Sequence, residues 1–277
     1  MTSQDRDRLR HLHDALGALM ARLSEDMPTA PADVSGKGQT GQDFVTSVDL
    51  ALQAGLETGL TALLPGARVV GEEGFAGMDR TGAPVWLVDP LDGTVNFVAG
   101  LPCYAMAVVL IRDGAPVLAA VRDLPRRVTY SAIAGEGAFL DGVPLRPRTH
   151  AARLAVLSSG LMRDLADNAP EVLSGLLGSF KLRNLGSQAL HLCHAAAGHL
   201  ALVASREARG WDDMAGALIA REAGLVYGHY GPASPETGAE QMSLCAPAGL
   251  FETHAVELAR SLPRMAAPQV HKESRNS

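Results

Sequence analysis

Residues 85–100 read VWLVDPLDGTVNFVAG and combine residue types that can bind a metal ion and an anion. An apolar run ends at Asp89, and Asp92 follows three residues later, directly before Gly93 and Thr94. A carboxylate at the end of a buried strand is costly to bury unless a cation faces it. Gly93 lets a ligand approach the backbone closely, and the free N–H groups of a helix beginning there favour a phosphate. The pattern predicts metal-assisted transfer of a phosphoryl group to water.

Further carboxylates stand at expected ends of helices and strands, where they could converge with the first pair. They are Asp43 and Asp49 in DFVTSVD, Glu72 and Glu73 in VVGEEG, and Asp212 and Asp213 in GWDDMAG. Each group also has a plainer interpretation. Acidic residues at helix N-termini are ordinary caps, the glutamate pair can be a solvated loop, and Asp92-Gly93 can be a turn.

The ligand types indicate which metal such a site would hold. Hard oxygen ligands without a matching set of histidines or cysteines favour Mg²⁺ over Zn²⁺. A zinc site on His191, His194 and His199, with Cys193 between the first two, is the alternative. Because that spacing fits no standard zinc set, a partly buried helix face is the favoured interpretation of these residues.

Composition excludes several other classes of protein. The chain has 277 residues, is 47% hydrophobic and carries a net charge of −6, which argues against a nucleic-acid polymer as partner. Three widely spaced cysteines suit a reducing compartment better than a disulfide framework. The N-terminus is too charged for a signal peptide, and no apolar run is long enough to span a bilayer. We therefore expect a cytoplasmic protein without membrane contacts.

Hydrophobic periodicity predicts the elements that position these residues. A leucine stripe from Leu9 to Leu23 predicts a first helix, residues 28–42 have loop composition, and a second helix is expected at 49–64. Strands are then expected at 68–71, 85–89, 105–112, 116–123, 127–133 and 138–140. Later strands are expected at 154–158, 181–185, 200–204, 225–227 and 242–245, alternating with helices at 163–177, 187–197, 212–223 and 248–262. We predict an α+β part at residues 1–147, an α/β part at 148–263 and a disordered tail at 264–277.

These motifs together resemble the inositol monophosphatase family of Mg²⁺-dependent, lithium-sensitive phosphatases, from about Gly36 to about Leu262. DFVTSVD is similar to its D-x-V-T-x-x-D element, and VGEEG to its G-E-E element. WLVDPLDGTVNFVAGLP matches its signature W-x-x-D-P-x-D-G-T-x-N-F-x-x-G-x-P, and GWDDMAGALIAREAG matches its W-D-x-x-A-G and E-A-G elements. The resemblance implies an α+β fold, the layered α-β-α-β-α sandwich of the inositol monophosphatase and fructose-1,6-bisphosphatase type, commonly as a homodimer.

The resemblance also implies a role for each matching residue. Glu73, Asp89 and the carbonyl of Leu91 would hold a first Mg²⁺ that activates water, and Asp89, Asp92 and Asp212 would hold a second. Glu73 would reach a weaker third ion, and Glu72 would stand behind the ligands. The N–H groups of Gly93 and Thr94 would bind phosphate. Thr94, with Asp43 or Asp49 behind it, would orient the water.

The chain departs from the family on the substrate side. Ser205 stands where inositol phosphatases have a glutamate that binds sugar hydroxyls, Glu207 is two residues away, and Gln188 replaces a usual alanine. Arg206 and Arg209 are either partners for a second anionic group or solvated surface residues. We expect a phosphomonoesterase for a small phosphorylated polyol or sugar. The alternatives are a 3′(2′),5′-bisphosphate nucleotidase, a fructose-1,6-bisphosphatase, a histidinol-phosphatase, or a non-catalytic protein that retains the fold.

Overall fold

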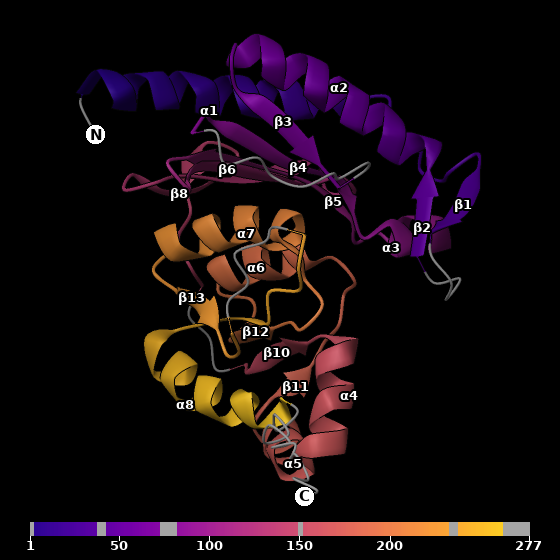
Figure 1. The fold of residues 1–277 in the computed structure, drawn as a ribbon, viewed down its shortest axis with the longest axis vertical. Helices are drawn as coiled ribbons and strands as arrows, with labels where there is room; N and C mark the ends of the chain where they lie inside the picture. Colours follow the sequence, from indigo (N-terminus) through magenta and orange to yellow (C-terminus); the bar gives the residue numbers. More distant parts are fainter. Residues whose placement is uncertain (1–2, 38–42, 73–81, 149–151, 233–237, 263–277) are drawn as a thin grey trace, which may run out of the picture.

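The computed structural model describes residues 3–37, 43–72, 82–148, 152–232 and 238–262. These residues form five layers, in which helices alternate with sheets (Figure 1). Helices α1 (Ser3–Leu23) and α2 (Ser47–Leu63) cover one face of a seven-stranded sheet. Helices α6 (Gln188–Ala196) and α7 (Gly210–Glu222) lie between that sheet and a five-stranded one. The predicted α-β-α-β-α sandwich is confirmed.

The seven-stranded sheet has the order β3-β4-β5-β6-β7-β8-β9. Its strands are β3 (Arg68–Gly71), β4 (Val85–Asp92), β5 (Ala105–Arg112), β6 (Ala115–Asp123), β7 (Val128–Ile133), β8 (Gly137–Leu140) and β9 (Val143–Pro144). Strands β3 and β4 are parallel, and the other pairs are antiparallel. Strand β4 is buried on both faces, because Trp86 and Val88 pack toward α1 and α2 while Leu87 packs toward α6 and α7. This explains its continuous apolar run.

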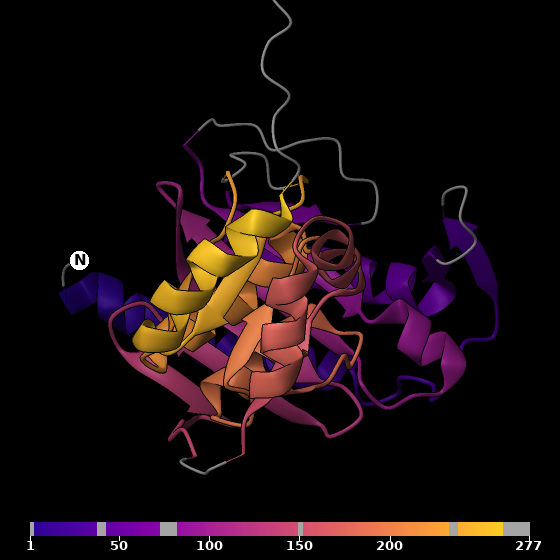
Figure 2. The same cartoon turned by 90° about the horizontal axis from the view of Figure 1, so that it is seen from below.

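The five-stranded sheet has the order β11-β10-β12-β14-β13. Its strands are β10 (Leu154–Leu157), β11 (Lys181–Leu182), β12 (Leu202–Ala204), β13 (Val226–His229) and β14 (Ser243–Ala246). The outer face of this sheet is covered by α4 (Ser159–Asn168), α5 (Pro170–Ser179) and α8 (Ala248–Leu258). Figure 2 shows α8 in yellow and α4 in salmon on this face. A short 3-10 helix, Ala259–Ser261, ends the described chain.

Two expected elements differ from the structure. Residues 28–42 were expected to be a loop, but β1 (Val34–Lys37) pairs with β2 (Asp43–Thr46) in an antiparallel ladder. The helix expected at 163–177 is instead two helices, because Pro170 cannot donate a helical N–H and begins α5. Apolar periodicity reports neither difference, because β1 (VSGK) has too few apolar residues to show a period and Pro170 interrupts an otherwise apolar segment.

The predicted division at residue 147 falls between β9 and β10, where one sheet ends and the other begins. One hydrophobic core nevertheless contains side chains from both parts, since α6 and α7 pack against the first sheet. The division into two domains therefore stays a prediction, and the tail at 264–277 lies outside the described residues. Within the described ranges, no helix is both long and apolar enough to cross a membrane.

Candidate active site

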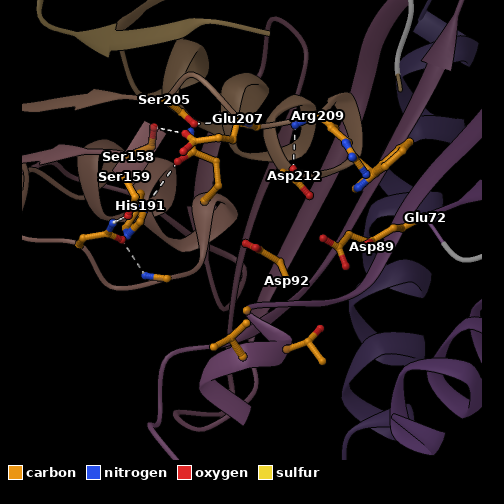
Figure 3. A pocket seen from close by; sticks show the side chains of 18 of the residues that line it. Glu72, Asp89, Asp92, Ser158, Ser159, His191, Ser205, Glu207, Arg209 and Asp212 are labelled. Carbon is orange, nitrogen blue, oxygen red and sulfur yellow. Dashed lines mark hydrogen bonds between the residues drawn. The ribbon is translucent and has the colours of Figure 1, made fainter. Parts of the chain in front are cut away.

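Three carboxylates from three different elements converge at one edge of the seven-stranded sheet. One oxygen from each of Glu72, Asp89 and Asp212 lies within 4.8 Å of the other two (Figure 3). Glu72 directly follows β3, Asp89 lies in β4 and Asp212 lies in the first turn of α7. Asp89 is only 1% exposed, so its charge has almost no contact with solvent. The parallel pairing of β3 and β4 brings the first two together, because the N–H of Glu72 donates to the carbonyl of Val88.

An irregularity in β4 places Asp92 beside this group. Asp89 is paired with Ala107 and Asp92 with Ala105, so β4 contains one extra residue over this interval. In a regular strand, residues three apart face opposite sides of the sheet. A β-bulge removes that alternation locally, and the two aspartates both line the same pocket.

The carboxyl groups resist ionisation together. Burial raises the pKa of Asp89 well above its usual value, and repulsion from Glu72, Asp92 and Asp212 raises it further. Burial also raises the pKa of Asp92 to about 6, against hydrogen bonds that favour its charged form. Burial, followed by repulsion from Asp92, raises the pKa of Asp212. Such a group is stable as carboxylates only when a cation neutralises it, and its all-oxygen donor set fits a hard divalent cation.

Asp92 is fixed by the start of helix α6. Its Oδ2 atom accepts a hydrogen bond from the hydroxyl of Ser187 at 2.6 Å and one from the N–H of Ala189 at 2.7 Å. Ser187 is also the N-cap of α6, since its hydroxyl accepts from the N–H of Leu190. These bonds use one oxygen of Asp92 and tie the first sheet to the second part of the chain.

Thr94 and Asp49 form a second polar group next to the carboxylates. The hydroxyl of Thr94 lies 3.0 Å from Asp49 Oδ1 and 2.9 Å from the carbonyl of Leu91, and its single proton can be donated to either. Asp49 is held by a capping box, in which its Oδ2 accepts from the N–H of Thr46 at 2.9 Å and from its hydroxyl. Asp49 therefore both caps α2 and orients Thr94.

The turn before α3 (Thr94–Ala99) requires glycine. Gly93 has a φ of 94°, and a Cβ added there would lie 2.9 Å from the carbonyl oxygen of Cys103. The side chain of Asn96 holds the turn, because its Nδ2 donates to the carbonyls of Cys103 at 2.7 Å and Leu185 at 2.6 Å. The first N–H groups of α3 have no acceptor within the helix, and Gly93 and Thr94 line the pocket.

A pocket joins the carboxylates to a polar wall built from the second part of the chain. This wall contains Ser158, Ser159, Asn184, Ser205 and Glu207. The carboxylate of Glu207 accepts hydrogen bonds from the hydroxyl of Ser158 and from the N–H of Gly160 at the start of α4. The wall can therefore offer both donors and acceptors to a hydroxyl-rich ligand.

Comparison with known proteins identifies the family of the chain. A sequence model of the inositol monophosphatase family matches residues 6–264. The chain belongs to the inositol monophosphatase family. It is 38% identical over 197 residues to an inositol-1-monophosphatase of Mycobacterium bovis, which covers 66% of this chain and 67% of the relative. It is 34% identical to an inositol monophosphatase of Mesembryanthemum crystallinum, over 70% of this chain and 75% of the relative.

Solved structures of the family share the fold. An IMPase of Thermotoga maritima superposes with a TM-score of 0.72 at 24% identity, covering 91% of this chain and 96% of that one. An IMPase/NADP phosphatase complexed with Mg²⁺ and phosphate superposes with a TM-score of 0.74 at 21% identity, covering 92% and 94%. The family assignment makes the chain a phosphoric monoester hydrolase of the inositol monophosphatase type.

Of the glutamate pair, only Glu72 lies within the described residues, so the prediction for Glu73 stays a prediction. Glu73, expected to be a metal ligand, lies outside the described residues. Glu72, expected behind the ligands, is itself one of the three clustered carboxylates. The parallel ladder explains this, because the residue after Gly71 continues beside Asp89 on the neighbouring strand. Asp43 is in β2, and its side chain is not described.

Two predicted substrate residues have structural partners. Gln188 lines the pocket, but its Nε2 donates to Asp213 at 2.8 Å. Ser205 is 3% exposed, and its hydroxyl accepts from the N–H of Ala208 at 3.1 Å. The roles of Ser187 and Asn96 were not predicted, although a serine at the start of an expected helix is a recognisable cap.

The histidines of α6 are buried between the two sheets. Burial lowers the pKa of His191 to about 3 and that of His194 to about 4, so both are neutral at pH 7. His191 Nε2 accepts from the N–H of Leu185, and the ring of His194 packs against that of His199. Among the described residues, the only cluster with metal-ligand geometry contains no histidine. The interpretation as a buried helix face is consistent with this structure.

Proposed function

We propose that this chain is a Mg²⁺-dependent phosphomonoesterase that hydrolyses a small polyol or sugar monophosphate. The observation that carries the proposal is the convergence of Glu72, Asp89 and Asp212 beside the Thr94–Asp49 pair. The three carboxylates suit cations, and the Thr94–Asp49 pair suits a water molecule. The relative from Mycobacterium bovis, named an inositol-1-monophosphatase, supports an inositol phosphate as the first substrate to test.

The residues present fit a site for two or three Mg²⁺ ions. We assign Asp89, Asp92 and Asp212 as carboxylate ligands, with the carbonyl of Leu91 as a further one. Glu72 is assigned from its place in the cluster, and Glu73 is retained as the ligand predicted from the sequence. Bound ions would supply positive charge that neutralises phosphate oxygens and lowers the pKa of a water molecule. A related structure in the family holds Mg²⁺ and phosphate, which supports this choice of metal.

The chain itself orients the attacking water and holds the phosphate. When Thr94 donates its proton to Asp49, its oxygen can accept a hydrogen bond from water and so fix the direction of attack. The N–H groups of Gly93 and Thr94 are proposed to hold phosphate oxygens. The water oxygen forms a bond to phosphorus as the ester P–O bond breaks. One water proton ends on the leaving alcohol, and the other remains on the phosphate product.

The far wall of the pocket favours a neutral polyol over a second phosphate. Its hydroxyl, amide and carboxylate groups come from Ser158, Asn184 and Glu207, and Glu240 adds another carboxylate. Arg206 is nearby, but it pairs with Asp164 at 2.5 Å and with Glu240 at 3.1 Å. Because its charge is already neutralised, this wall would repel a second phosphate.

A substrate panel tests the proposal. The purified protein with Mg²⁺ would be given inositol 1-phosphate, fructose 1,6-bisphosphate, adenosine 3′,5′-bisphosphate and histidinol phosphate, and phosphate release would be measured. We expect the highest kcat/KM for inositol 1-phosphate, and no turnover in EDTA or in Asp89→Asn. A preference for either bisphosphate would overturn the proposed substrate class. Equal turnover in EDTA would overturn the metal-dependent mechanism.

A further inference from the structure

We propose that Arg209 is a catalytic residue whose guanidinium contacts the phosphate that is hydrolysed, an inference that rests on the proposed function. Arg209 is the only lysine or arginine among the described residues that line the pocket. Its side chain is exposed, and within the described part of the chain it forms no ion pair with a carboxylate. A charged donor group therefore faces the pocket with no acidic partner among the residues that the structure describes.

The backbone and side chain of Arg209 are both held in place. Its N–H donates to Asp212 Oδ2 at 2.7 Å, which fixes the residue at the start of α7 next to a proposed metal ligand. Its guanidinium carbon lies 5.6 Å from the centre of the Trp211 ring, and Trp211 is only 4% exposed. A buried ring is a rigid surface for the guanidinium, and this cation–π contact leaves the N–H groups free to donate.

The position of Arg209 indicates which part of a substrate it meets. In Figure 3, Arg209 lies on the side of Asp212 that also contains Asp89 and Glu72. Ser205 and Glu207, on the polar wall, lie on the opposite side of Asp212. A substrate with its phosphate at the carboxylates and its polyol at the wall would present phosphate oxygens to Arg209.

The neighbouring arginine shows that this arrangement is particular to Arg209. Arg206 is three residues away, but it does not line the pocket and pairs with Asp164 and Glu240. The two arginines therefore have different roles: Arg206 links the end of β12 to α4, and Arg209 is available to a ligand. Of the two interpretations that the sequence left open, an anion partner applies to Arg209 alone.

The guanidinium of Arg209 adds a positive charge to a pocket lined by carboxylates. Every other charged side chain lining the described pocket is acidic, so without added positive charge the pocket repels a phosphate. A guanidinium remains charged at all relevant pH values, and its planar donors match two phosphate oxygens. It would stabilise the charge on those oxygens while the water–phosphorus bond forms and the ester bond breaks.

Three substitutions test the inference. Arg209→Gln removes the charge, Arg209→Lys retains the charge without the planar donors, and Arg221→Gln is the matched control. Arg221 is an exposed arginine on the same helix, its guanidinium is 5.1 Å from the Tyr227 ring, and it does not line the pocket. Each variant would be assayed for turnover of inositol 1-phosphate and of fructose 1,6-bisphosphate. The affinity of inorganic phosphate in the presence of Mg²⁺ would be measured separately.

For Arg209→Gln we expect kcat/KM to fall by about 10- to 100-fold and phosphate affinity by about tenfold, as for the loss of one charged donor. Arg209→Lys should restore part of both losses, and Arg221→Gln should match the wild type. The Mg²⁺ concentration that half-saturates the thermal shift without phosphate should stay unchanged, which separates phosphate binding from metal binding.

Three results would overturn the inference. They are an unchanged phosphate affinity in Arg209→Gln, an equal loss in Arg221→Gln, or a loss confined to fructose 1,6-bisphosphate. The last would mean that Arg209 recognises a second anionic group. If the wild-type protein releases no phosphate from any substrate, the proposed function fails instead, and the phosphate affinity still reports on Arg209.

Discussion

Substituting Asp89 with asparagine should abolish turnover and yet stabilise the protein when metal is absent. Asp89 is 1% exposed, and one of its oxygens lies within 4.8 Å of a carboxylate oxygen of both Glu72 and Asp212. At 4.8 Å and an effective dielectric constant of about 20, each fully ionised pair costs roughly 3.5 kcal/mol. Because protonation relieves part of this repulsion, we expect Asp89→Asn to raise the free energy of unfolding by about 2 kcal/mol in EDTA.

The assay is thermal unfolding at pH 7.5 with and without saturating Mg²⁺. In EDTA, Asp89→Asn should have a Tm about 5 °C above that of the wild type. In Mg²⁺ the order should reverse, because the wild type gains binding free energy and the variant has lost a central ligand. A variant that is less stable than the wild type in EDTA would refute the electrostatic reasoning.

The neighbouring buried aspartate gives a matched control. Asp213 is 0% exposed, but it accepts hydrogen bonds from Gln188 at 2.8 Å and from the Tyr227 hydroxyl at 3.0 Å. It lies outside the carboxylate cluster, so Asp213→Asn should gain no stability in EDTA and should retain the Mg²⁺-induced rise in Tm.

Three further predictions concern the water, the protons and the polar wall. Thr94→Val, which keeps the shape of the side chain, should lower kcat about 100-fold while leaving the Mg²⁺-induced rise in Tm intact; an unchanged kcat would show that the hydroxyl orients no water. Burial raises the pKa of Asp92 to about 6, so the metal-free protein should lose stability as pH rises through 6, and more Mg²⁺ should be needed for the same Tm shift at pH 5.5 than at pH 7.5. A Mg²⁺ requirement that is the same at both pH values would contradict this expected direction. Asp92→Asn should make the Mg²⁺ requirement less dependent on pH. Glu207→Ala should raise KM for inositol 1-phosphate about fivefold or more while changing kcat less than about twofold. Glu207→Gln should raise KM less, because it keeps one acceptor oxygen for the hydroxyl of Ser158. A KM equal to that of the wild type would exclude a role for Glu207 in binding.

Much of the fold was predictable because its signals are local. The leucine stripe predicted α1, and the apolar runs predicted the central strands of the first sheet to within a few residues. The first ladder and the break at Pro170 were missed, since β1 contains too few apolar residues to show a period and the proline lies within an otherwise apolar segment.

The three aspartates of the site were easier to predict from the sequence than the glutamate. Asp89, Asp92 and Asp212 stand at ends of elements that local pattern and family motifs identify, and the pocket contains all three. The place of Glu72 in the cluster required the pairing of β3 with β4, because the parallel ladder brings the residue after Gly71 next to the end of β4.

The sequence by itself determined the class of chemistry, since carboxylates, a Gly-Thr turn and their order along the chain report which groups are available. Only the tertiary structure decided which groups act together, because that depends on distances between elements far apart in the chain. Arg206 and Arg209 show the difference. They are three residues apart and of the same type, yet one is neutralised by Asp164 and Glu240 while the other faces the pocket. Ion pairs and burial form in three dimensions, so linear spacing could not distinguish the two.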